Sequence, residues 1–207
     1  MPPVFCRIPL RYIQQKTGVP HQAILQKIAS EFPEIHISGT QPDRYIQRKI
    51  IMNKLIFVTG LANGGKTTTI KAFLKLFGKI RTGTNITING KSYQIRDYSN
   101  CDVGWDEFIK RVKKFSLNKN LLYPLCLDIN NKENNYTNFN QIVEFLDSLN
   151  SNHDLYFFII KNGNKNRSLK EEYINTIKQK YDLSKIKIID NNLADNSNKL
   201  KEFLESI

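Results

Sequence analysis

From residue 52 onward, the apolar positions alternate between short continuous runs and longer stretches in which they recur every three to four residues. The short runs predict buried strands, at residues 55–59, 123–127, 155–160 and 186–189. The longer stretches predict amphipathic helices, at residues 66–77, 105–115, 139–149, 169–181 and 199–204. Strands separated by helices of crossover length form right-handed βαβ units. The sequence therefore predicts an α/β fold with three layers around a mainly parallel sheet.

A tight hairpin interrupts this alternation. Residues 86–88 and 93–96 flank Asn89 and Gly90, a pair that accepts the left-handed backbone of a two-residue hairpin turn. We expect this hairpin at an edge of the sheet. Gly78 follows the last apolar position of the 66–77 helix and predicts a left-handed helix end.

Residues 1–51 differ in composition from the rest of the chain. They contain six Gln and no Asn, whereas residues 52–207 contain 23 Asn. This change predicts a domain boundary at Met52, with a small segment before it and the α/β domain after it.

The first segment has a helical pattern. Residues 11–16 and 21–32 are predicted helices separated by a turn at Gly18 and Pro20. The spacing over residues 10–32 resembles a helix-turn-helix, which predicts a small α-helical N-terminal segment. Three roles stay open for it: contact with DNA, a packing arm, or an extension ahead of a start at Met52.

Composition restricts the function only broadly. Lys and Arg outnumber Asp and Glu by 31 to 19, for a formal charge of +12, which suits nucleic acid, an acidic membrane surface or a phosphorylated small molecule. Coding DNA rich in A and T would also enrich Lys and Asn. The longest apolar run, 155–160, is too short to cross a bilayer, and residues 4–10 lack a signal-peptide pattern. We therefore expect a cytoplasmic protein with no membrane partner. Neither the cysteines nor the histidines have metal-ligand spacing.

One segment predicts specific chemistry. The run at 55–59 leads into Gly60-Leu61-Ala62-Asn63-Gly64-Gly65-Lys66-Thr67-Thr68 and then into the 66–77 helix. Glycines let the backbone curl so that successive N–H groups converge on an anion, and the helix start adds its own unpaired N–H groups and dipole. We expect Lys66, exposed until phosphate arrives, to reach the β- and γ-phosphates. The Thr67 hydroxyl is expected to bind Mg²⁺, and Thr68 to touch the α-phosphate.

This strand, glycine loop and helix resemble the P-loop NTPase superfamily over residues 54–205. The resemblance implies a P-loop fold that binds ATP or another NTP with Mg²⁺. The nucleotide-binding residues would be Gly60, Asn63, Gly64, Gly65, Lys66, Thr67 and Thr68. The resemblance also implies an aspartate at the end of a second strand in the Mg²⁺ shell. Asp128 fits that position, and Asp97, which ends the hairpin, is its competitor.

The sequence departs from the motifs of several better-known families of the superfamily, which narrows the families to which it could belong. Ile129 follows Asp128 where helicases and motor ATPases usually have a glutamate. Residues 161–165 lack the aspartate of the guanine-specific motif, and Leu61 and Ala62 stand where MinD-like and ParA-like ATPases have a second lysine. Strand order is needed to separate the kinase–GTPase branch from the additional-strand ATPase branch.

The remaining interpretation is a small kinase-like NTPase that hydrolyses ATP or transfers its phosphoryl group to a small acceptor. Residues 165–167 are a candidate lid that would place Arg167 beside Lys66 and Asp128 as catalytic residues, although the polar character of this segment favours an ordinary solvated loop. Asp102 or Asp106 is a candidate base toward an acceptor hydroxyl, or a cap of the 105–115 helix. Two alternatives stay open: a DNA-associated nucleotide switch that uses residues 10–32, and a nucleotide-binding pseudo-enzyme.

Overall fold

The structure is a computed structural model that describes residues 52–116, 119–128, 138–163 and 167–207, without the side chain of Asp128, and the backbone of three strands before residue 52. The chain divides into two compact units, Met1–Ile51 and Met52–Ile207. This division falls where the composition of the sequence changes.

The first unit contains an antiparallel sheet. Its strands are β1 (Phe5–Pro9), β2 (Ile35–Ser38) and β3 (Tyr45–Lys49), in the order β1-β3-β2. The expectation of a purely helical segment is therefore wrong for these residues. Each strand has only four or five residues, so its alternating pattern is too short to stand out in the sequence. Whether such a segment forms a strand depends on pairing with distant strands more than on local propensity. The helix-turn-helix-like pattern at 10–32, and the DNA contact expected from it, lie outside the described residues.

The second unit is built on a six-stranded sheet of order β5-β6-β7-β4-β8-β9. Its strands are β4 (Asn53–Leu61), β5 (Asn85–Ile88), β6 (Lys91–Ile95), β7 (Asn120–Asp128), β8 (His153–Ile160) and β9 (Ile186–Ile189). Only β5 pairs antiparallel within this sheet, and it does so with β6 through a turn at Asn89 (φ 48°) and Gly90 (φ 74°). The predicted α/β class, mainly parallel sheet and edge hairpin are confirmed.

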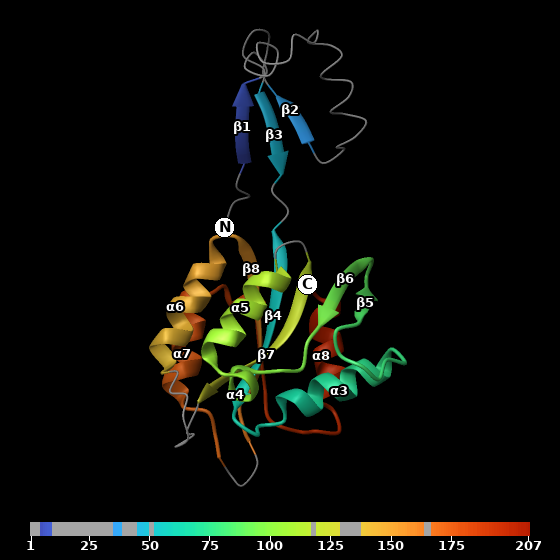
Figure 1. Ribbon diagram of the computed structural model, residues 1–207, viewed down its shortest axis with the longest axis vertical. Coiled ribbons are helices and arrows are strands. Elements are labelled where there is room, and N and C mark those ends of the chain that lie inside the picture. The colour runs from blue at the N-terminus through green and yellow to red at the C-terminus, as the bar shows by residue number, and fades with distance from the viewer. Residues whose placement is uncertain are drawn as a thin grey trace. The chain divides into compact units, whose positions relative to one another are not determined.

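Helices cover both faces of this sheet (Figure 1). The described helices are α3 (Lys66–Leu76), α4 (Asn100–Val103), α5 (Trp105–Ser116), α6 (Phe139–Asn150), α7 (Glu171–Lys180), α8 (Asn196–Glu205) and the 3-10 helix η1 (Leu183–Lys185). Leu55 and Phe57 of β4 pack with α5, α6 and α7, whereas Ile56 and Val58 pack with α3 and α8. This alternation is what a central strand buried on both faces requires, and it gives the three expected layers.

The parallel strands bring five loops to one edge of the sheet. Strands β4, β6, β7, β8 and β9 run in the same direction, so the segments that follow them emerge together at their carboxyl ends. In open α/β sheets, ligands bind at this edge. Within the described residues, no helix has the length and apolar character needed to span a membrane.

Candidate nucleotide-binding site

The glycine loop joins β4, at the centre of the sheet, to α3. The pairing of β4 with β7 shifts register between Gly60 and Leu61, and the Gly64 N–H donates to the Leu61 carbonyl oxygen at 3.0 Å. Asn63 (φ 57°) and Gly65 (φ 87°) both have left-handed backbones, and Gly65 caps the start of α3. A left-handed residue followed by a helix start turns successive N–H groups inward, which is the geometry of an anion-binding concavity.

Close packing requires glycine in this loop. A Cβ atom on Gly60 would lie 2.9 Å from the Ile160 carbonyl oxygen, and one on Gly64 would lie 2.9 Å from the Leu61 carbonyl oxygen. Both obstacles are backbone atoms, which cannot move aside as a flexible side chain can. The two glycines therefore allow the loop to fold tightly over the end of β4.

The first turn of α3 offers free donors. The first hydrogen bond of the helix is donated by the Thr69 N–H to the carbonyl oxygen of the cap residue Gly65, at 2.8 Å. Among the described residues, the N–H groups of Lys66, Thr67 and Thr68 have no backbone acceptor, as expected at a helix start. Together with the positive end of the helix dipole, these groups favour an anion in front of the loop.

Lys66 lies across the glycine loop. Its side chain is buried, with 5% exposure, and its Nζ donates to the Leu61 carbonyl oxygen at 2.5 Å. The expectation that this lysine is exposed until phosphate arrives is therefore wrong, because the curled loop lets its own carbonyl hold the ammonium group. An ammonium has three hydrogens, and within the described residues this carbonyl is the acceptor that it reaches. Hydrogens thus remain for a phosphate oxygen.

Thr67 lies beside Asp97, which follows β6. The Thr67 hydroxyl donates to the Asp97 carbonyl oxygen at 3.3 Å, and Lys71 Nζ lies 4.0 Å from Asp97 Oδ2. Asp97 Oδ1 is buried and has no hydrogen-bond partner in the described part of the chain. A cavity of about 560 Å³ lies at this place, with Asp102 also in its wall. The structure therefore brings the expected metal ligand Thr67 together with Asp97.

Asp128 ends β7, where it pairs in register with Leu61 of the glycine loop. Its side chain lies outside the described residues, so its role in the Mg²⁺ shell stays a prediction. Elsewhere in the described part of the chain, no group of three or more His, Cys, Asp or Glu side chains is gathered. A Mg²⁺ ion on Thr67 does not require such a group, because Mg²⁺ in nucleotide sites takes most ligands from phosphate and water.

The two candidate bases lie in helix starts. Asp102 Oδ2 accepts hydrogen bonds from the Ser99 N–H at 2.7 Å and from the Ser99 hydroxyl at 2.8 Å, which forms a capping box at α4. Asp102 thus caps α4 rather than the predicted 105–115 helix. Asp106 is exposed in the first turn of α5 and does not line the cavity beside Thr67.

The loop after β8 lies against the glycine loop. A Cβ atom on Gly163 would lie 3.0 Å from Leu61 Cδ1 and 3.7 Å from the Gly64 Cα. The Gly163 N–H donates to the Arg167 carbonyl oxygen at 2.7 Å, which closes the loop. Arg167 is exposed, and it does not line the cavity beside Thr67. The rest of the predicted lid, Lys165 and Asn166, lies outside the described residues.

Sequence reasoning missed a buried asparagine that supports α3. Asn196, at the start of α8, donates to Asn191 Oδ1 at 2.9 Å and to Thr69 Oγ1 at 3.4 Å, and its side-chain oxygen accepts from the Asn192 N–H at 3.0 Å. It thereby fixes the loop after β9 beside Gly65. The available signal was the polar run directly after a predicted strand, which the general abundance of Asn concealed.

Two thiols, Cys101 of α4 and Cys126 of β7, lie close to each other. Asn100 of α4 donates to the Cys126 carbonyl oxygen at 3.0 Å and accepts from the Cys126 N–H at 2.7 Å, which attaches α4 to β7. The hydrogen bond with Cys126, together with burial, raises the pKa of the Cys101 thiol. Within the described residues, neither of these two cysteines is part of a disulfide bond.

Comparisons with known proteins add no family assignment. No protein-family model, curated protein or solved structure matches this chain.

Proposed function

We propose that this protein binds an NTP with Mg²⁺ at the glycine loop and transfers its γ-phosphoryl group to a small acceptor, as a kinase-like P-loop phosphotransferase. The arrangement of the glycine loop carries the proposal. Left-handed Gly65 caps the start of α3, the first-turn amides have no backbone acceptors among the described residues, and the Lys66 ammonium lies across the loop. These groups match what a triphosphate requires, namely several converging N–H donors and one mobile cation.

Strand order supports the kinase–GTPase branch of the superfamily. Strand β7, which ends at Asp128, pairs directly with β4 from Leu55 to Leu61. An additional-strand ATPase would have a further strand between these two. Under the proposal, Asp128 acts on the Mg²⁺ that Thr67 holds.

The cavity beside Thr67 favours transfer over hydrolysis. Its volume of about 560 Å³ lies within the range of small-molecule sites. In the proposed step, an acceptor hydroxyl oxygen bonds to the γ-phosphorus. The bond from that phosphorus to the β–γ bridging oxygen breaks, and its electron pair leaves with the nucleoside diphosphate. The hydroxyl proton passes to the unpartnered Asp97 Oδ1.

Nucleotide binding is tested by calorimetry with ATP, in Mg²⁺ and in EDTA. We expect Thr67→Val to remove most of the gain in ATP affinity that Mg²⁺ provides, because valine cannot ligate the ion. Thr176→Val is the matched control, since the Thr176 hydroxyl donates to the Glu172 carbonyl oxygen within α7 and does not line the cavity beside Thr67. Equal Mg²⁺ dependence in the wild type and Thr67→Val would contradict the metal site.

Transfer is tested with ATP labelled in the γ-phosphate. We expect label to enter a member of a panel of nucleosides, sugars and their phosphates faster than it is released as inorganic phosphate. If ATP binds but no acceptor in the panel raises its turnover above the rate with water alone, the protein is better explained as a hydrolase. Absence of single-turnover hydrolysis as well would favour the pseudo-enzyme.

A further inference from the structure

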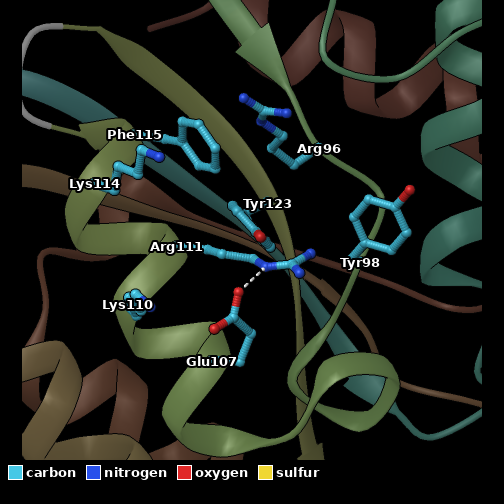
Figure 2. Close-up of a pocket in the computed structure, with 8 residues that line it drawn as sticks. All are labelled: Arg96, Tyr98, Glu107, Lys110, Arg111, Lys114, Phe115 and Tyr123. Atoms are coloured by element: carbon cyan, nitrogen blue, oxygen red, sulfur yellow. Dashed lines mark hydrogen bonds and ion pairs between the residues drawn. The ribbon is translucent and has the colours of Figure 1, made fainter.

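A second cavity, of about 320 Å³, opens between α5, β7 and the segment that follows β6 (Figure 2). Four cationic side chains line it, from Arg96, Lys110, Arg111 and Lys114. Among the described residues of its wall, Glu107 is the only carboxylate, and Arg111 Nε already donates to Glu107 Oε1 at 2.7 Å. Positive charge is therefore in excess in this cavity, which favours an anionic ligand.

Two buried donors in the same cavity lack acceptors. Tyr123 is 1% exposed, and its hydroxyl has no hydrogen-bond partner among the described residues; the same holds for the buried Nε of Arg96. Figure 2 shows the Tyr123 hydroxyl directed toward Arg111. Burial raises the pKa of the Tyr123 phenol, so the group is a hydrogen-bond donor at neutral pH. Buried donors are almost always satisfied in folded proteins, and an anion would satisfy both.

Aromatic rings give the cavity a rigid wall. The Arg96 guanidinium carbon lies 3.7 Å from the centroid of the Phe115 ring, and that of Arg111 lies 5.6 Å from the centroid of the Tyr98 ring. Stacking of this kind orients a guanidinium without neutralising its charge. Arginine held in a fixed plane is suited to the paired oxygens of a phosphate.

The two cavities adjoin. Tyr98 and Arg111 line both the cationic cavity and the cavity beside Thr67. The described residues contain six buried side-chain atoms without hydrogen-bond partners, and three of them belong to Arg96, Asp97 and Tyr123. Of these three, Asp97 offers an oxygen acceptor in the cavity beside Thr67, and Arg96 and Tyr123 offer two donors in the cationic cavity.

We infer that the cationic cavity binds the phosphate of a small phosphomonoester, whose hydroxyl group lies toward Asp97 in the adjoining cavity. A dianionic phosphate suits the excess of cations better than a carboxylate does. The assignment of this molecule as the phosphoryl acceptor rests on the proposed function, whereas the phosphate site itself does not. The same chemistry is found in a free phosphomonoester and in the terminal phosphate of a nucleic-acid strand, and the volumes of the two cavities, about 320 and 560 Å³, favour the free molecule.

The phosphate site is tested by calorimetry on the full chain with inorganic phosphate, at fixed ionic strength. We expect Tyr123→Phe and Arg96→Gln each to weaken phosphate binding roughly tenfold, the usual effect of losing one hydrogen bond to a charged group. Tyr93→Phe is the matched control, because the Tyr93 hydroxyl is also buried and unpartnered but does not line this cavity. Since the Tyr123 hydroxyl has no partner, Tyr123→Phe should fold normally, and its thermal melt verifies this.

Lys66→Met separates this site from the glycine loop, which could also bind phosphate. Unchanged phosphate affinity in Lys66→Met, with a loss in Tyr123→Phe, supports the cationic cavity. A loss in Lys66→Met alone, or equal affinity in Tyr123→Phe, Arg96→Gln and the wild type, overturns it. If Tyr123→Phe and Arg96→Gln weaken phosphate binding but the wild type does not bind ATP, the phosphate site is supported and the proposed phosphoryl transfer is contradicted.

The source of the phosphate is tested with ribose 5-phosphate, AMP and a 5′-phosphorylated hexanucleotide. We expect the first or second to compete with inorganic phosphate, with the competition weakened by Tyr123→Phe and not by Tyr93→Phe. Competition by the hexanucleotide alone would overturn the assignment of a small-molecule ligand.

Discussion

Substitution of Lys66 by methionine separates the role of this lysine in binding from its role in the fold. Its Nζ donates to the Leu61 carbonyl oxygen, which also accepts the Gly64 N–H at 3.0 Å. Loss of the ammonium therefore leaves that carbonyl satisfied, and methionine retains most of the apolar stem. Because the substitution removes a buried cation as well as one hydrogen bond, we expect the free energy of unfolding to change by no more than about 1 kcal/mol.

The effect on nucleotide binding should be much larger. If Lys66 makes two bonds to β- and γ-phosphate oxygens, each contributing about 1.5 kcal/mol or more, their loss weakens ATP binding by about 3 kcal/mol, or roughly 100-fold. ATP at 100 times the wild-type Kd stabilises the wild type by about 2.7 kcal/mol, but the variant by only about 0.4 kcal/mol. For a protein of this size, the corresponding rises in Tm are about 5–10 °C and about 1–2 °C.

The assay is a thermal melt with and without Mg·ATP, together with calorimetric titration. Lys75→Met is the control, since Lys75 is an exposed lysine in the last turn of α3, and it should behave like the wild type. An ATP-dependent rise in Tm that is the same in Lys66→Met and the wild type would refute the assignment of Lys66 to the phosphates. A large loss of stability without ATP would instead make Lys66 a structural residue.

Three further predictions concern the walls of the site. Gly65→Ala should destabilise the protein by about 1–2 kcal/mol in urea unfolding, because φ is 87° and the new Cβ would lie 2.9 Å from Leu193 Cδ2. Gly78→Ala, where φ is 65° and no atom lies near the new Cβ, should destabilise the protein less. Equal losses in the two variants would show that the contact with Leu193 adds nothing to the cost. Asp97→Asn should reduce phosphoryl transfer about 100-fold or more with little change in Mg·ATP affinity, whereas a loss of that affinity would assign Asp97 to the metal. The raised pKa of Cys101 predicts slow alkylation by iodoacetamide at pH 8 in a Cys6→Ser background, and labelling as fast as in the urea-unfolded chain would contradict it.

Local signals account for what the sequence predicted well. The strand before Gly60, the helix from Lys66 and the hairpin turn at Asn89 and Gly90 each depend on residues adjacent in the chain, and the structure contains all three. The left-handed end of α3 at Gly78 (φ 65°) is equally local. In these places the backbone conformation is restricted by the residue type itself.

Non-local packing accounts for what the sequence did not predict. The position of Asp97 beside Thr67 depends on β7 pairing between β6 and β4, and strand order is not encoded in any short segment. Burial of Lys66 depends on a carbonyl that the loop turns toward it. Paired residues of β1 and β3 are 36 to 44 positions apart in the chain, from Pro9 with Tyr45 to Phe5 with Lys49. The short alternating pattern of each strand therefore does not identify its partner.

The cationic cavity also resolves an ambiguity in the charge of the protein. A basic composition with abundant Lys and Asn is explained equally well by coding bias and by function. The two explanations differ in where they place the cations, because coding bias would scatter them over the surface without regard to the fold. On α5, however, Lys110, Arg111 and Lys114 line the same cavity, whereas Lys113 does not. Arg96 reaches this cavity from the end of β6, and the buried Tyr123 hydroxyl lies there without an acceptor. Bias in composition supplies lysines but does not orient a buried phenol toward them, so the phenol is the stronger reason to expect a bound anion.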